Sequence, residues 1–155
     1  MQRFFVYTAA CLLALSPLAN AADVPAFEDY AVPLADGLPA ISLDAASLQA
    51  AGMDKAQHEA LANALDDLPK VAGHYVLAEW GCGTDCLQAA LIDRHTGTAI
   101  PLPGPLCCQE GEGEMITTRP DSALIIVSGK HPRSNTSQTQ YYVVANGRLE
   151  RLGEH

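Results

Sequence analysis

Between residues 40 and 70, four hydrophobic residues repeat at the spacing of a helix. They are Leu61, Ala64, Leu65 and Leu68, which share one helix face. Asp54, followed three residues later by Gln57, forms a capping-box sequence that predicts where this helix begins. A shorter helical turn is expected from Asp44 to Ala51, and the apolar positions from Phe27 to Val32 predict a short edge strand. The N-terminal part of the domain is therefore predicted to be a helical region.

Beyond residue 73 the pattern changes to short alternating runs separated by turn residues, which is typical of β-strands. Seven strands are predicted: His74–Trp80, Leu87–Asp93, Thr98–Leu102, Glu114–Thr118, Ala123–Ser128, Thr139–Ala145 and Arg148–Leu152. Asn146-Gly147 is the strongest hairpin signal, because both residues tolerate a positive φ. Successive short strands with tight turns predict an antiparallel β-meander. The fold class expected is α+β, with the helical region packed on the meander in one disulfide-stapled domain over residues 22–155.

A cleaved export signal is predicted for residues 1–21. Arg3 supplies the positive start, an almost unbroken apolar run extends from Phe4 to Leu18, and Ala19-Asn20-Ala21 is the small-x-small pattern at which signal peptidase cuts. The apolar run is too short to be a membrane-spanning helix. Cys11 lies within the run and is lost with the signal. The mature protein is therefore expected in the periplasm, without a membrane span.

The net charge of the chain limits the classes of molecule that it is expected to bind. Nine basic and 18 acidic residues give a net charge of −9, and removal of the signal, which carries one basic residue and no acidic one, makes it −10. Such a chain is poorly suited to bind nucleic acid or an anionic lipid surface. A basic protein partner is compatible with this charge, although exported proteins are often acidic for solubility alone.

Four cysteines remain after the signal is removed: Cys82, Cys86, Cys107 and Cys108. An even number in an oxidising compartment predicts two disulfides. One possible pairing joins Cys82 to Cys86 and Cys107 to Cys108, and the other two cross-link the pairs. The strained ring of an adjacent pair and the chain entropy of longer loops favour crossing, whereas proximity in sequence favours the local Cys82–Cys86 loop. The sequence leaves the three pairings open.

The residues that could carry function gather around one predicted strand and the turn that follows it. The candidate binding residues are His74, Trp80, Gly81, Gly83, Thr84 and Asp85. The two glycines allow a tight turn, which a local disulfide would make rigid. Trp80 is expected to pack in the core beside the disulfide, and stacking on a ligand is the alternative. His74 is expected to be a partly buried strand residue.

Four short motifs stand out along the mature chain. They are Ala72-Gly73-His74-Tyr75, Trp80-Gly81-Cys82-Gly83-Thr84-x-Cys86, Asp93…Thr96-Gly97 and Tyr141-Tyr142-Val143…Asn146-Gly147. Together they resemble a family of small exported bacterial proteins of unknown function. The chain departs from the family pattern just before Gly73, where Lys70-Val71 replaces Asn-Phe. The resemblance implies an exported α+β protein and assigns no catalytic residue.

Three classes of function are compatible with these residues. The leading hypothesis is a non-enzymatic binding or inhibitor-like module of the periplasm, without a cofactor, whose partner is another envelope protein. A second is a thiol-active or hydrolytic enzyme that uses Cys82 and Cys86 with His74 or Asp85. A third is a periplasmic zinc- or copper-binding protein that uses the cysteines and His74, although their spacing is not the usual C-x₂-C pair. Nucleophile-elbow, zinc-hydrolase and phosphate-loop motifs are missing from the sequence.

Overall fold

The computed structural model describes residues 24–39, 41–107, 114–130 and 136–153. The predicted export signal and Cys108 lie outside the described residues. Within the described part of the chain, none of the helices has the length and hydrophobicity to cross a membrane.

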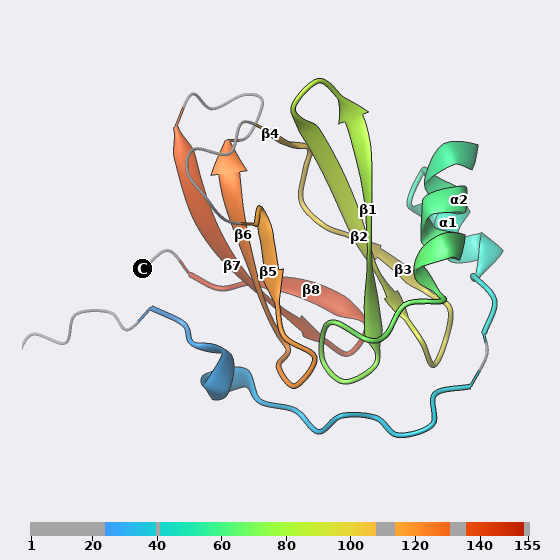
Figure 1. Ribbon diagram of the computed structural model, residues 1–155, viewed down its shortest axis with the longest axis horizontal. Coiled ribbons are helices and arrows are strands. Elements are labelled where there is room, and N and C mark those ends of the chain that lie inside the picture. The colour runs from blue at the N-terminus through green and yellow to red at the C-terminus, as the bar shows by residue number, and fades with distance from the viewer. Residues whose placement is uncertain (1–23, 40, 108–113, 131–135, 154–155) are drawn as a thin grey trace, which may run out of the picture.

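Eight antiparallel strands dominate the fold (Figure 1). They are β1 (Tyr75–Gly83), β2 (Cys86–Asp93), β3 (Ala99–Pro101), β4 (Leu106–Cys107), β5 (Ile116–Thr118), β6 (Leu124–Lys130), β7 (Ser137–Ala145) and β8 (Arg148–Arg151). Their order is β1-β2-β4-β6-β7-β8, with β3 paired to β2 and β5 paired to β6. Strand β4 joins two wings, because Cys107 is opposite Cys86 on one side and Lys130 on the other. We call β1, β2 and β3 the first wing, and β5 to β8 the second wing.

The strand pattern in the sequence is confirmed. Each of the seven predicted strands overlaps a strand of the sheet, to within a few residues at the ends. The predicted hairpin turn joins β7 to β8, where Asn146 and Gly147 have φ of 52° and 70°. Strand β4 was not predicted, because it is only two residues long and follows three prolines that are typical of a loop.

The main core lies between the two wings. Each wing contributes its apolar face, which is formed by every second residue along its strands. Its buried members are Val71, Ala72, Tyr75, Leu77, Ala89, Leu91, Ile100, Leu102, Leu106, Ile116, Ala123, Ile125, Val127, Tyr142 and Val144. A second core covers the outer face of the first wing. There Val76, Ala78, Ala90, Ile92 and Ala99 pack with Leu48, Leu61 and Ala64 of the helices. Tyr75 and Leu77 therefore face one core, and Val76 and Ala78 face the other.

The predicted α+β class is wrong, because the fold is mostly antiparallel sheet and no extended N-terminal helical region forms in the described residues. In the described part of the chain, the helical elements are η1 (Phe27–Tyr30, a 3₁₀ turn), α1 (Ala45–Ala50) and α2 (Lys55–Ala64). The capping box is confirmed: the Gln57 backbone N–H donates to Asp54 Oδ1 at 2.9 Å, and the Asp54 N–H donates to Gln57 Oε1 at 2.8 Å. The helix then ends at Ala64, so the expected apolar face is cut short and Leu68 is 83% exposed.

The edge strand predicted from Phe27 to Val32 is also wrong. Phe27–Tyr30 forms the 3₁₀ turn, and only Ala31 makes an isolated bridge, to Ser122. The N-terminal segment then runs beneath both wings toward α1 (Figure 1). Ser122 is fully buried and holds this segment, because its hydroxyl donates to the Phe27 carbonyl at 2.8 Å. The segment is thus a strap that is hydrogen-bonded to the sheet, and it carries little regular structure.

Candidate functional site

The turn between β1 and β2 is the most exposed part of the predicted site. Residues 81–85 are exposed, and Asp85 adopts a φ of 51° at the tip. Cys82 and Cys86 are joined by a disulfide, with their Cα atoms 5.0 Å apart. The local pairing is therefore the one that forms, and both crossed pairings are excluded. The pairing of Cys107 with Cys108 stays a prediction, because Cys108 lies outside the described residues.

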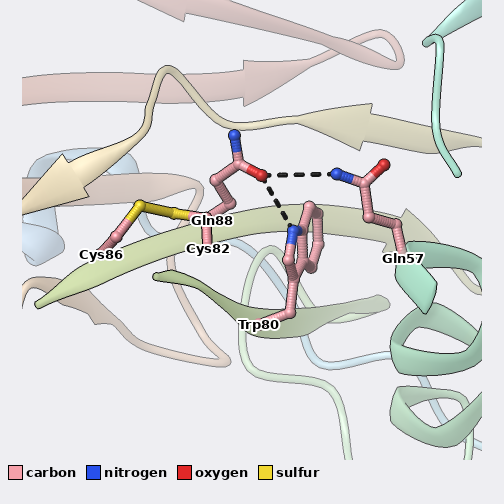
Figure 2. Close-up of a disulfide and its surroundings, with 5 residues drawn as sticks. All are labelled: Gln57, Trp80, Cys82, Cys86 and Gln88. Carbon is pink, nitrogen blue, oxygen red and sulfur yellow. Dashed lines mark hydrogen bonds between the residues drawn. A yellow bond between two sulfur atoms is a disulfide. The ribbon is translucent and has the colours of Figure 1, made fainter. Parts of the chain in front are cut away.

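Behind the disulfide, Trp80 lies on the face of the first wing that α2 covers. Figure 2 shows its indole Nε1 donating to Gln88 Oε1 at 3.0 Å, and the same oxygen accepts from Gln57 Nε2 at 3.4 Å. The ring is partly buried and packs against the outer core. It also lines an open cavity of about 300 Å³, together with Met53 and Pro101. Through Gln88, Trp80 thus connects the part of β1 next to the turn with α2.

His74 lies at the other end of β1, far from the disulfide. It belongs to the turn before β1 and not, as expected, to the strand; the seven residues between His74 and Cys82 are all in β1, and an extended chain over these eight steps spans about 26 Å. Its neighbours are Asp93, whose Oδ1 is 3.7 Å from His74 Nε2, and the rings of Tyr75 and His95, with centroids at 4.3 and 4.5 Å. Burial lowers the pKa of His74, Asp93 raises it by a smaller amount, and His95 lowers it.

These positions separate the residues that the enzyme hypothesis combines. Cys82 and Cys86 are bonded to each other, and His74 is out of reach of both. Asp85 stays beside Cys86 at the exposed tip. Among the described residues, no group of three or more histidine, cysteine and acidic side chains is placed to hold a metal ion.

The sequence did not point to a cavity of about 470 Å³ between the two wings, beside β1 and β5. Its lining residues are Pro69, Lys70, Leu77, Glu79, Glu114, Met115, Ile116, Thr118 and Pro120. Burial raises the pKa of the Glu79 carboxyl, Lys70 lowers it, and the second carboxyl, Glu114, raises it again. One signal was present: Glu79 follows Tyr75 and Leu77 at period two, so an acidic residue extends the inner apolar face of β1.

Comparison of the chain with models of known protein families, with curated proteins and with solved structures finds no significant match.

Proposed function

We propose that the mature protein is a non-enzymatic binding module of the bacterial periplasm, which recognises another envelope protein. The observation that carries this proposal is the β1–β2 turn, where a disulfide fixes an exposed tip. A fixed turn loses little conformational freedom when a partner binds, so its contacts contribute more fully to affinity.

The tip offers contacts suited to recognition. Thr84 and Asp85 are exposed side chains that follow the glycine-containing end of β1, and a Cβ atom on Gly83 would have nothing within 4 Å. Hydroxyl, carboxylate and backbone groups together favour a polar partner with hydrogen-bond donors. The net charge of −10 that remains after removal of the predicted signal further favours a basic partner surface.

In-cell photo-crosslinking tests the proposal. A photoreactive amino acid in place of Thr84 should give one discrete crosslinked band in the periplasmic fraction. The matched control carries it in place of Arg148, an exposed residue of the β7–β8 hairpin, which has no disulfide. Equal crosslinking from both positions, or none from Thr84 under several growth conditions, would contradict recognition through the tip.

A further inference from the structure

The 470 Å³ cavity beside β1 is closed at one end by the backbone of residues 70–73. The backbone N–H groups of Lys70 and Val71 donate to the Tyr75 carbonyl at 2.8 and 3.2 Å, and the Tyr75 N–H donates to the Val71 carbonyl at 2.9 Å. Val71 and Tyr75 form an antiparallel bridge. Residues 70 and 71 therefore add to the outer edge of β1 as a strand would.

The same segment is bonded to the second wing. The Ala72 N–H donates to the Ser122 carbonyl at 2.8 Å, and the Gly73 N–H donates to the Pro120 carbonyl at 2.7 Å. Residues 70–73 thus lie between β1 and the turn that follows β5, and they fill the lower end of the gap between the wings. Of these residues only Lys70 and Val71 pair with β1 as a strand would, whereas Ala72 and Gly73 form a turn with φ of 46° and 75°.

Above that segment the edge of β1 is open. The N–H and C=O of Tyr75 point away from β2, and in a regular antiparallel ladder these groups alternate from one side to the other. The pairing of β1 with β2 is regular from Tyr75 to Gly81. Leu77 and Glu79 therefore also direct their backbone groups away from β2, where no further strand pairs with them among the described residues.

Strand β5 has a matching open edge. The Met115 carbonyl accepts from the Ser128 N–H of β6 at 2.8 Å, so it points toward β6. By the same alternation, Ile116 and Thr118 direct their backbone groups away from β6. Leu77, Glu79, Ile116 and Thr118 all line the 470 Å³ cavity. An unpaired strand edge is a template for another strand.

The charges of the lining residues indicate which kind of peptide this cavity would bind. Among the described residues that line it, two are acidic, Glu79 and Glu114, and one is basic, Lys70. Glu79 is exposed overall, but burial on the cavity side raises the pKa of its carboxyl, so a further positive charge would stabilise its ionised form. Leu77 and Ile116 are buried beside these carboxylates and provide an apolar floor.

We propose that an extended peptide segment of a partner protein adds to the open edge of β1, with a basic side chain over Glu79 and Glu114. This inference rests on the proposed binding function and gives it a second contact surface. Since Val71 pairs antiparallel with β1, a peptide continuing in that direction passes Glu79 first and Leu77 two residues later. Its pattern is therefore Lys or Arg, any residue, then an aliphatic residue.

Selection from a random peptide library displayed on phage tests this pattern, with the mature, oxidised protein as bait. Peptides with the basic-x-aliphatic pattern should be enriched. Their affinity should fall about tenfold or more for Glu79→Lys/Glu114→Lys. Glu150→Lys, an exposed glutamate on β8, is the matched control and should bind as the wild type does. Peptides with Glu in place of the basic residue should bind the charge-reversed variant better than the wild type.

Hydrogen exchange on the wild type gives a readout that needs no variant. On addition of a selected peptide, the amides of Leu77 and Glu79 should become protected. The amides of Val76 and Ala78, which already face β2, are internal controls and should not change.

Any of four results would overturn the proposal that a partner peptide adds to β1. One is a selection without enriched peptides, the second is equal binding to the wild type and the charge-reversed variant, and the third is protection confined to another strand. The fourth is self-association through β1, seen as protection of Leu77 that depends on protein concentration without peptide, which would assign the edge to a second copy instead. Crosslinking from Thr84 in cells would still support the binding function in all of these cases, so the two proposals fail separately.

Discussion

Strands β1 and β2 are stabilised by a disulfide at one end and by packing against the N-terminal strap at the other. At the tip, Gly81 to Asp85 are exposed, and the disulfide between Cys82 and Cys86 is what fixes the turn. At the other end, which we call the base, the N-terminal strap packs against the turns of the sheet. A Cβ atom on Gly97 would lie 2.2 Å from the Ser42 carbonyl oxygen, and one on Gly73 would lie 2.4 Å from that of Pro33.

This difference indicates which residues are constrained by folding and which are available for recognition. The base is fixed by long-range backbone contacts, so its sequence is restricted by packing. The tip makes few such contacts, and a covalent bond maintains its conformation. Thr84 is therefore expected to tolerate substitution without loss of stability, as surface positions generally do, whereas Asp85, with a φ of 51°, should tolerate only Asn or Gly equally well.

The largest effect is expected at the base, from Gly73→Ala. The new methyl group would meet the Pro33 backbone, and the φ of 75° is unfavourable for alanine. We expect a loss of about 2–4 kcal/mol in the free energy of unfolding, measured by urea denaturation. Gly147→Ala is the matched control, because it has a φ of 70° and nothing within 4 Å, and should cost only about 1 kcal/mol. Equal losses would show that the strap contact does not restrict Gly73.

Removal of the brace at the tip should have a smaller effect. Cys82→Ser/Cys86→Ser opens a five-residue loop, which corresponds to about 2 kcal/mol in the chain-entropy account of disulfides. The domain should still fold, because neither cysteine belongs to the buried core clusters. Denaturation under non-reducing conditions measures the loss, with Thr84→Ala as the control that keeps the disulfide. Failure of the double variant to fold would mean that the tip carries more of the stability than we infer.

The smallest effect concerns His74 at the base. Because burial lowers its pKa in the folded state, the unfolded state binds protons more readily, and stability should decrease as the pH falls below about 6.5. His74→Gln should make the melting temperature less dependent on pH in this range. His95→Gln keeps His74 in place and should retain most of the dependence. Parallel curves for the wild type and His74→Gln would contradict this role of burial.

The sequence predicted local structure better than overall architecture. Turn chemistry at Asn146-Gly147 and the capping box at Asp54 and Gln57 were sufficient to place a hairpin and a helix start, because both depend on neighbouring residues. The α+β class was wrong because apolar residues at helical spacing up to Leu68 predict a longer helix than the one that forms. The helix ends before Leu68, and that side chain is exposed. The strap was missed because its hydrogen bonds go to distant partners, such as Ser122.

The candidate site was predicted in part. The disulfide turn could be found from the spacing of glycine and cysteine, and the structure shows that Cys82 pairs with Cys86. His74 was placed with that turn by proximity in sequence, yet an extended strand carries it to the opposite end. The cavity at Glu79 could not be predicted, because it depends on how the two wings approach each other and on residues from β5.

Mass spectrometry of alkylated, unreduced protein from the periplasm tests the central claim most directly, since it reports export and the covalent brace together. The account predicts a chain that begins at Ala22 and a proteolytic fragment in which Cys82 and Cys86 are linked and resist alkylation. A chain that keeps Met1 and carries alkylated Cys82 and Cys86 would contradict it.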